Sequence, residues 1–387
     1  MPLAVYVIGL SIFAQGTSEL MLAGLLPELA RDLDVGIPQA GLLISAFAVG
    51  MLAGAPVLAV VTLRWPRRAT LLAFLAVFAV VHVAAALTDS YEFLLVTRVV
   101  GAFVYAGFWA VATVAVLSLV PEDSRGRAMG IVAGGLTVAT IAGLPAGTFV
   151  GQHLGWRAAF WAVAIMSLLA MAAVRATVHN GPTTGARPSV AAELRAMANP
   201  RLWLAYATTA LLMTALIVTF GYLAPLLTET TGLPDGAVPV VLGVYGLGSL
   251  IGITVGGRTA DRHPFRTLAY GTGGLVAASA VLAATAHAPL PAIAAVFLIG
   301  AFGFAVNPAL NTRVFAESAQ APTLAAALNI AAFNVGITAG PWLGGRALDA
   351  GADYPVVAWL GAATGVVALG AVALGAVSVR REKALVP

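Results

Sequence analysis

Apolar residues fill long blocks of the chain, and charged residues gather in short clusters between these blocks. Two such clusters are "RWPRR" at 64–68 and "PEDSRGR" at 121–127, and the blocks between clusters contain 18 or more residues. An apolar run of this length crosses a bilayer as an α-helix. No ten-residue alternation of polar and apolar positions is present, so the pattern predicts helices and not the strands of a membrane barrel.

The blocks predict twelve membrane spans. The first block lacks a basic stretch before it and a small-residue cleavage site after it, so we interpret it as a retained helix and not as a signal peptide. No soluble domain is expected outside the membrane. The approximate bounds of the predicted spans are 3–29, 39–63, 69–88, 92–119, 126–151, 155–175, 202–228, 236–257, 266–286, 290–314, 322–347 and 354–378.

Composition agrees with this interpretation. Of the 387 residues, 60% are hydrophobic and 9% are charged, whereas about 25% are charged in soluble domains. The sequence contains no cysteine, and its five histidines have no metal-ligand spacing, so we expect no metal, no cofactor and no enzymatic activity. It also contains no nucleotide-binding loop of the G-x-x-x-x-G-K-S/T kind, which leaves the proton gradient as the energy source.

The basic residues predict the orientation in the membrane. Sixteen Lys and Arg residues lie on the side that carries both termini, three (Arg31, Arg157 and Arg346) lie on the other side, and Arg98 lies within a span. The positive-inside rule therefore predicts a multi-pass protein of a bacterial cytoplasmic membrane with both termini cytoplasmic. Because these charges are spread over short loops and form no single basic face, no nucleic-acid partner is expected.

The second half of the chain repeats the first. Two six-helix bundles related by duplication explain the repeat, and transporters with such repeats bind substrate between them near the bilayer midplane. The repeat therefore favours transport over catalysis. At an offset of 198 residues the matches are Leu25 with Leu223, Pro27 with Pro225, Gly50 with Gly248, Gly54 with Gly252 and Arg64 with Arg262.

The only long polar stretch lies between spans six and seven and contains an early Gly-Pro pair. We interpret it as a cytoplasmic linker, with a short amphipathic helix at 190–198. The predicted domains are an N-terminal six-helix bundle at 1–175, the linker at 176–200, and a C-terminal six-helix bundle at 201–387. The expected fold is thus an all-α membrane protein with two pseudo-symmetric bundles.

Several motifs resemble those of the major facilitator superfamily over essentially the whole chain. They are "GAPVLAVVTLRWPRR" after span two with its repeat "GGRTADRHPFR" after span eight, "RVVGAFVYAG" in span four, "GGLTVATIAGLPAG" in span five and the "GWRAAFW" that follows. Within the superfamily they resemble the drug:proton antiporters with twelve spans. "GTSELMLAGLLPELARDL" together with "GAFVYAGFWAVA" is similar to the branch of arabinose-efflux permeases and chloramphenicol exporters, and most similar to actinobacterial chloramphenicol resistance proteins.

The resemblance implies a monomer that exports a small amphipathic drug, chloramphenicol, against protons by alternating access through the lipid bilayer. It also implies a cytoplasmic latch, in which loop charges lock one conformation. Leu63 stands where the first copy of this loop has an Asp in the family. The predicted latch residues are Arg64, Arg67, Arg68, Asp261 and Arg262.

Glu19 lies inside the first span, about ten residues from its end, or roughly 15 Å deep at 1.5 Å per residue. An acidic side chain at that depth usually faces the bundle interior or a water-filled cavity. Because an apolar environment favours the protonated form of a carboxyl group, Glu19 is a candidate proton carrier. The alternative is a protonated Glu19 that bonds a neighbouring helix for structure alone. Its repeat partner is Ile217, so the acid is not part of the duplicated scaffold.

Arg98 lies about six residues into span four, near 9 Å deep, and is expected to interact with Glu19 in proton coupling. With Ala102, Tyr105 and Trp109 it forms one helical stripe that presents a cation and two aromatic rings to a flat drug. The alternatives are an Arg98 side chain that reaches outward to lipid headgroups, and aromatic residues that only pack. Gln15, Glu19, Arg98, Tyr105 and Trp109 are the predicted substrate-binding residues of the first half.

The second half offers a weaker stripe in span eleven, with Asn329 and Phe333 as candidate substrate-binding residues. Hydrogen bonds between helices are the alternative for Asn329 and for Asn334. His82 stands alone on an apolar span, so we expect it to be packed or hydrogen-bonded and leave it out of the site.

In span five, Gly134, Gly143 and Gly147 with Pro145 are expected to allow close helix packing and a bend. Two other functions compete with drug export. An exporter of a sugar or another metabolite would need several cavity-facing hydrogen-bonding side chains, and few are present. A polytopic membrane enzyme would need a polar catalytic cluster, which the sequence lacks.

Overall fold

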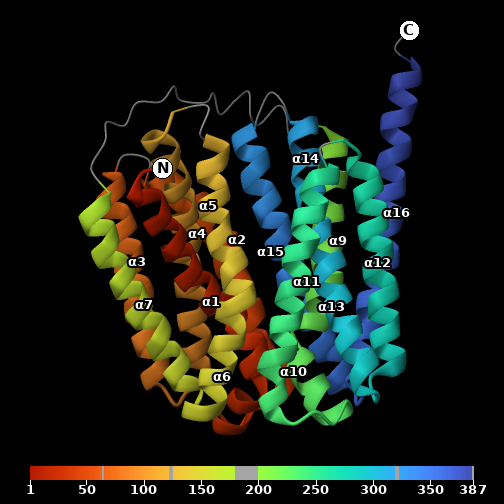
Figure 1. Cartoon of the computed structure of the whole chain (residues 1–387), viewed down its shortest axis with the longest axis horizontal. Helices are drawn as coiled ribbons and strands as arrows, with labels where there is room; N and C mark the ends of the chain where they lie inside the picture. The colour runs from red at the N-terminus through yellow and green to blue at the C-terminus, as the bar shows by residue number, and fades with distance from the viewer. Residues whose placement is uncertain (63–64, 122–124, 179–198, 261, 319–321, 386–387) are drawn as a thin grey trace. The chain divides into compact units, whose positions relative to one another are not determined.

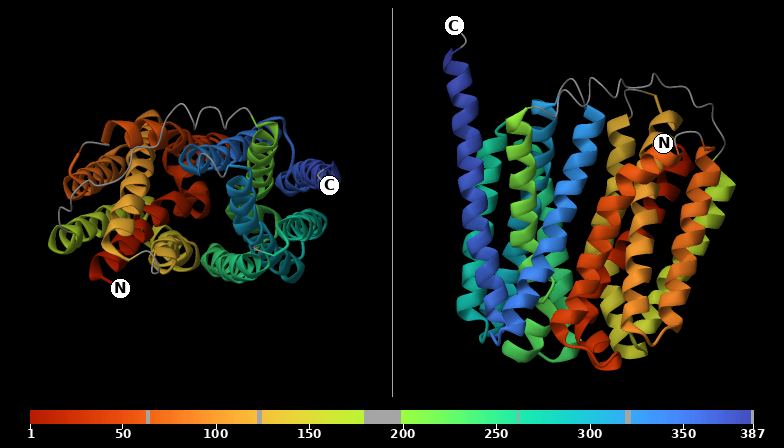
Figure 2. Two further views of the ribbon diagram at one scale, coloured as in Figure 1. Left: turned by 90° about the horizontal axis from the view of Figure 1, so that it is seen from above. Right: turned by 180° about the vertical axis from the view of Figure 1, so that it is seen from behind.

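A computed structural model describes the chain except for residues 63–64, 122–124, 179–198, 261, 319–321 and 386–387. The described residues contain helices and no strand. Within each of two compact units the long helices lie side by side, with their axes roughly aligned (Figures 1 and 2). The prediction of an all-α fold is confirmed.

Eight helical elements build the first half of the chain. The fifth predicted span is divided among three of them, α5, η3 and α6, whereas the other spans are single helices. The elements are α1 (Leu3–Asp32), α2 (Ile37–Val61), α3 (Arg67–Leu87), α4 (Tyr91–Leu119), α5 (Arg125–Val138), η3 (Ala139–Gly143), α6 (Leu144–Leu154) and α7 (Trp156–Thr177).

The second half repeats this order with two interrupted spans. Span seven turns at Gly221 and Tyr222, and span ten is broken at Val306, where Pro308 has no N–H to give to the helix. The elements are α9 (Pro200–Phe220), α10 (Leu223–Pro225), η4 (Leu226–Thr230), η5 (Asp235–Ala237), α11 (Val238–Ala260), α12 (Pro264–Thr285), α13 (Pro289–Ala305), α14 (Asn307–Glu317), α15 (Pro322–Asp349) and α16 (Pro355–Leu385).

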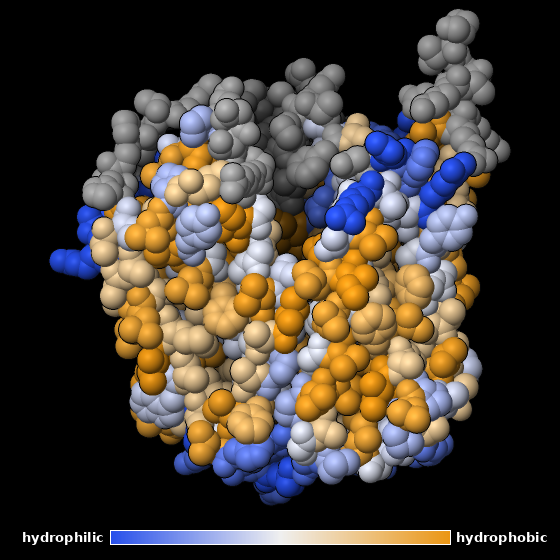
Figure 3. All heavy atoms as spheres, viewed as in Figure 1, coloured by the Kyte–Doolittle hydropathy of each residue, from blue (hydrophilic) through white to orange (hydrophobic). Residues whose placement is uncertain are grey.

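All twelve predicted spans are helical. Among the described residues, eleven helices are long and apolar enough to cross a membrane. The twelfth span is α15, whose 28 residues extend roughly 42 Å at 1.5 Å per residue. Figure 3 shows apolar side chains over the sides of the helices and hydrophilic ones gathered at their ends. Exposed apolar residues of the helices include Val80, Leu169 and Val367. Apolar sides of this kind are typical of helices that face lipid.

The two units consist of Met1–Gly185 with Pro234–Gly243, and of Ala186–Leu233 with Val244–Pro387. The boundary thus falls inside α11. The predicted linker at 176–200, with its amphipathic helix at 190–198, lies largely outside the described residues, so the predicted domain bounds stay a prediction.

Glycines make the same helix contact in both units. A methyl group at Gly50 of α2 would lie 2.3 Å from the Val99 carbonyl oxygen of α4, and one at Gly248 of α11 would lie 2.3 Å from the Phe297 carbonyl oxygen of α13. The four residues differ by the same offset of 198 between the units. Only glycine permits backbones to approach this closely, so the repeat seen in the sequence is a repeat of packing.

The glycine-rich fifth span packs against α1. Methyl groups at Gly143 and Gly147 would lie 2.2 Å from the Thr17 hydroxyl and 2.8 Å from Met21 Cβ, which confirms close packing. The expectation for Gly134 is wrong, because nothing lies within 4 Å of a methyl group there. The neighbouring Gly135 makes the contact instead, 2.1 Å from the Gly9 carbonyl.

The expected bend in the fifth span takes the form of a π-helical turn, η3. The N–H of Leu144 bonds the carbonyl of Ala139, five residues earlier. Pro145 follows directly and has no N–H to continue the regular ladder. Such π-turns are often found at functional sites, and this one lies beside Thr17, two residues before Glu19.

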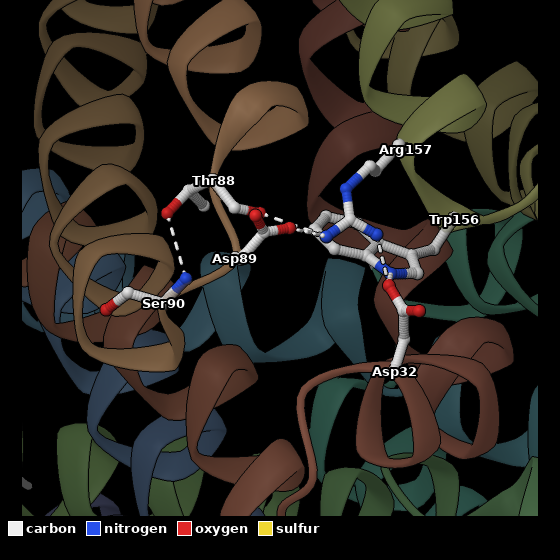
Figure 4. Close-up of polar contacts among 6 residues, drawn as sticks. All are labelled: Asp32, Thr88, Asp89, Ser90, Trp156 and Arg157. Atoms are coloured by element: carbon white, nitrogen blue, oxygen red, sulfur yellow. Dashed lines mark hydrogen bonds and ion pairs between the residues drawn. The ribbon is translucent and has the colours of Figure 1, made fainter.

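An ion-pair cluster joins three helix ends of the first unit (Figure 4). The Arg157 guanidinium, at the start of α7, pairs with Asp32 at the end of α1 and with Asp89 before α4, the latter at 2.6 Å. Trp156 Nε1 donates to Asp32 at 2.7 Å, and Arg157 lies 4.3 Å over the Trp156 ring. Thr88 completes the set with its carbonyl, 3.2 Å from Arg157.

In the second unit, the Tyr354 hydroxyl donates to Glu229 at 3.4 Å. Burial raises the pKa of Tyr354 to about 12, so the phenol keeps its proton for this bond. This single neutral donor is a weaker tie than the Arg157 cluster.

We expect Gly252→Ala to destabilise the protein, because its new methyl group would lie 1.9 Å from the Ala301 carbonyl oxygen. The expected loss is about 1–3 kcal/mol, measured as thermostability and yield in detergent. The control is Gly257→Ala on the same helix, where nothing lies within 4 Å and alanine gains up to about 1 kcal/mol. Equal stability of the two variants would contradict the packing argument.

We expect Arg157→Gln to lower the thermostability of the purified protein by about 1 kcal/mol, since it removes both ion pairs from partly exposed groups. Arg31→Gln is the control, because the Arg31 side chain is 71% exposed and its ion pair with Glu28 is long at 3.9 Å. If both variants have the same melting temperature as the wild type, the cluster does not stabilise the helix ends.

Candidate functional site

Arg98 is buried inside the first unit. Its guanidinium donates from Nη1 to the Ser18 hydroxyl at 2.9 Å and from Nη2 to the Ser18 carbonyl at 3.1 Å. Its flat face lies 4.2 Å over the Phe47 ring of α2. With 2% of its surface exposed, Arg98 does not reach outward to headgroups, so that alternative is excluded.

The hydrogen bonds continue from Ser18 to His82 of α3. His82 Nε2 lies 2.5 Å from the Ser18 hydroxyl oxygen, and Nδ1 lies 2.7 Å from the Phe78 carbonyl oxygen. A carbonyl only accepts, so Nδ1 carries the proton and Nε2 of the neutral ring accepts from Ser18. The chain therefore runs from Arg98 through the Ser18 hydroxyl and His82 to the backbone of α3.

Glu19 follows Ser18 on α1 and is half-buried. Its charge and that of Arg98 act on each other, but among the described residues no ion pair joins them, because the Nη atoms of Arg98 bond Ser18. Glu19 thus lies next in sequence to Ser18, the residue that binds the guanidinium, and forms no ion pair with Arg98 in the described structure. This arrangement can exchange a proton, whereas a closed ion pair would hold the carboxylate charged.

The predicted stripe on α4 is present. Arg98, Ala102 and Tyr105 are buried, and Trp109 is half-buried. The Tyr105 ring lies 6.0 Å from the Phe47 ring. Its buried hydroxyl has a hydrogen-bonding neighbour in Trp109, but it donates to no acceptor among the described residues. The stripe therefore offers a phenol hydroxyl that can still donate a hydrogen bond beside aromatic faces.

Gln15, one turn before Ser18 and Glu19 on α1, is fully buried. Its Nε2 donates to the Ser11 carbonyl at 3.2 Å, and its Oε1 has no partner among the described residues. Gln15 thus adds a second unsatisfied polar atom to the interior of the first unit.

Asn329, in the second unit, is bonded between helices. Thr209 of α9 donates to its Oδ1 at 3.1 Å, and its Nδ2 donates to Asn311 of α14 at 2.9 Å. Asn334 bonds the Ile330 carbonyl on its own helix at 2.9 Å. Asn329 thus follows the alternative interpretation, and its role in binding stays a prediction.

Phe333, one turn from Asn329, is half-buried. Of the predicted latch residues, Arg64 and Asp261 lie outside the described residues. Arg67 is half-buried, Arg68 donates to the Arg175 carbonyl, and Arg262 is exposed. No cluster of three metal-ligating side chains occurs among the residues that the structure describes.

Sequence reasoning omitted Ser18 and His82 from the site. A usable signal was present, because His82 lies six residues before the predicted end of span three and Arg98 six residues after the predicted start of span four. Two polar residues at equal depth on consecutive spans can meet. The expectation that His82 is hydrogen-bonded is confirmed. Its partner Ser18 also binds Arg98, so His82 belongs to the same network as Arg98.

Comparisons with known proteins agree with this fold. A family model described as "Major Facilitator Superfamily" matches residues 8–323. The chain is 45% identical to the "Chloramphenicol resistance protein" of Streptomyces lividans, over 88% of each chain. It is 36% identical to the "Uncharacterized MFS-type transporter YtbD" of Bacillus subtilis, over 95% of this chain and 93% of that one.

The fold is also similar to that of a solved bacterial homolog of the human lysosomal transporter Spinster. The TM-score is 0.72 at 18% identity, and the match covers 97% of this chain and 94% of the other. This likeness concerns the fold alone.

We expect Tyr105→Phe to leave thermostability within about 0.5 kcal/mol of the wild type, because the lost hydroxyl donates to no acceptor among the described residues and its neighbour Trp109 is half-buried. Tyr222→Phe is the matched comparison, since Tyr222 is equally buried but donates to the Pro341 carbonyl at 2.7 Å. The loss of that bond costs about 1 kcal/mol. A larger loss from Tyr105→Phe than from Tyr222→Phe would show that the Tyr105 hydroxyl does donate a hydrogen bond in the folded protein.

Proposed function

Since the chain belongs to the major facilitator superfamily and is a multi-pass membrane transporter, we propose that it exports a small amphipathic drug in exchange for protons. Chloramphenicol is the proposed substrate, because the relative with 45% identity is called a chloramphenicol resistance protein. The observation that carries the proton part is the half-buried Glu19, which is next in sequence to Ser18, the residue that binds the Arg98 guanidinium, and forms no ion pair with Arg98 among the described residues.

In the proposed cycle, a proton that enters from outside the cell binds Glu19 and neutralises it. The neutral carboxyl group lets the two halves rock to the inward-open state, in which the proton leaves to the cytoplasm and the drug binds. Arg98 supports the charged carboxylate whenever the two groups approach. The proton gradient is the only energy source required.

Drug binding is assigned to the aromatic stripe and the vacant polar atoms beside it. Chloramphenicol has one flat aromatic ring with hydroxyl and amide groups, which suits the aromatic faces of Tyr105 and Trp109. Among the described residues the buried Tyr105 hydroxyl donates to no acceptor, and the buried Gln15 Oε1 accepts from no donor, so the first can donate to a drug and the second can accept from one. Asn329 and Phe333 are the proposed contribution of the second half.

The remaining features of the proposal follow from sequence and family. Both termini lie in the cytoplasm of a bacterial cell, the protein works as a monomer, and it binds no nucleic acid. Arg64, Arg67, Arg68, Asp261 and Arg262 form the proposed cytoplasmic latch. An exporter of a sugar or another metabolite is the alternative that the experiment below separates from drug export.

The test compares the wild type with Glu19→Gln in a chloramphenicol-sensitive host. We expect the wild type to raise resistance and drive proton-dependent efflux, and Glu19→Gln to lose both at least tenfold, because an amide cannot carry the proton. Glu92→Gln, which changes an exposed carboxylate at the start of α4, is expected to behave as the wild type.

Membrane expression of all three proteins is checked by immunoblot. If wild type and Glu19→Gln protect equally, Glu19 is structural and the proton site lies elsewhere. If neither protects, the drug is wrong and export of a sugar or metabolite becomes the leading hypothesis.

A further inference from the structure

The Ser18 hydroxyl differs from those of the buried serines that bond a carbonyl of their own helix. Ser11 donates to the Val7 carbonyl at 2.9 Å, and Ser167 donates to the Val163 carbonyl at 2.8 Å, each four residues earlier. Ser18 makes no such bond in the described structure, and its hydroxyl bonds His82 across helices at 2.5 Å. His82 therefore sets the direction in which this hydroxyl points.

That direction matters for Arg98. With its proton directed at His82 Nε2, the Ser18 oxygen presents its lone pairs to the Arg98 guanidinium at 2.9 Å. Without the imidazole, the hydroxyl would turn to its own helix, as in Ser11, and leave this position. The hydrogen bond that the hydroxyl donates to His82 Nε2 also polarises the hydroxyl and strengthens its oxygen as an acceptor.

We propose that His82 is a positioning residue that acts through Ser18. It holds the guanidinium of Arg98 docked on α1 and out of an ion pair with Glu19. The inference rests on the proposed function, in which Glu19 carries the transported proton. His82 stays neutral in this role. A proton on Nε2 would make the ring a cationic donor, and the Ser18 oxygen, which already accepts from Arg98, would then face two cations.

The groups that face this network are few. The titratable or charged ones are Glu19 on α1, His82 on α3, and Arg98 and Tyr105 on α4. The side chains that α2 and α7 contribute are aromatic. The Phe47 ring of α2 lies against the Arg98 guanidinium, and the centre of the Phe160 ring of α7 lies 5.7 Å from that of His82. A pH response of this part of the unit thus arises from those four side chains.

The proposal predicts the direction of that response. A guanidinium released from Ser18 can pair with the neighbouring Glu19 carboxylate, and such a pair favours the charged form. Glu19 would then load its proton only at lower pH. Loss of His82 is therefore expected to shift the pH dependence of proton loading to the acid side without removing Glu19 or Arg98.

The experiment follows the Glu19 carboxyl group directly, by infrared difference spectroscopy of the purified protein in lipid. The band is identified by its absence in Glu19→Gln and titrated with pH. His82→Met removes the acceptor, whereas His82→Gln has nearly the same size and offers a carbonyl oxygen to Ser18. Ser18→Ala tests the intermediate residue, and it decides the proposal if His82→Met does not fold.

We expect the band's pH midpoint to move about one unit to the acid side in His82→Met and in Ser18→Ala, and to stay at the wild-type value in His82→Gln. Because His82 acts through Ser18, the double variant is expected to move no further than Ser18→Ala alone. The proposal would be overturned by an unchanged midpoint in His82→Met or in Ser18→Ala. It would also be overturned if His82→Met and His82→Gln shifted the midpoint equally, or if the shifts of His82→Met and Ser18→Ala added in the double variant.

Chloramphenicol exchange by the same proteins in proteoliposomes separates this inference from the proposed function. If the midpoint shifts as expected but the wild type does not exchange the drug, positioning stands and drug export fails. If the wild type exchanges the drug but the midpoint does not shift, drug export stands and the positioning role is rejected.

Discussion

A guanidinium buried inside a membrane-spanning bundle needs hydrogen-bond acceptors, because an unsatisfied charge in an apolar environment costs several kcal/mol. Arg98 has two acceptors on one residue, the hydroxyl and carbonyl of Ser18. This requires α1 to run close to α4 at that level. The contacts of Gly143 with Thr17 and of Gly147 with Met21 hold α1 in place beside the fifth span. The position of α1 in the first unit therefore depends on this bonded charge as well as on glycine packing.

The two units share a scaffold but not this chemistry. The glycines of α2 and α11 contact their partner helices at equivalent positions, so duplication preserved the packing. The polar network belongs to one copy only, which means that the chemistry was added to, or kept in, one half of a symmetric frame. At the same offset of 198, the counterparts of Ser18, Glu19, His82 and Arg98 are Leu216, Ile217, Ala280 and Val296.

Sequence patterns could predict the spans, because the thickness of the bilayer sets the length of an apolar block and charged clusters stay outside its hydrocarbon core. They could also select Glu19 and Arg98, since a charge at depth is costly wherever it points. Equal depth could have suggested His82 as a neighbour of Arg98, but it could not show that both side chains point toward Ser18, because depth along a span says nothing of the direction a side chain takes around its helix. The same limit explains Gly134: two adjacent glycines look alike in sequence, yet only Gly135 faces α1.

The neutral character of the Arg98 partners suits the proton exchange that we propose for Glu19. A carboxylate docked permanently on Arg98 would form a buried ion pair whose separation leaves two unpaired charges. A hydroxyl and a carbonyl satisfy the guanidinium with bonds of more modest strength. Arg98 can therefore stay on Ser18 while Glu19 gains and loses its proposed proton, and no buried ion pair has to separate. In this proposal His82, bonded to the α3 backbone through Phe78, keeps Ser18 as the partner of Arg98 and leaves Glu19 as the group whose charge changes.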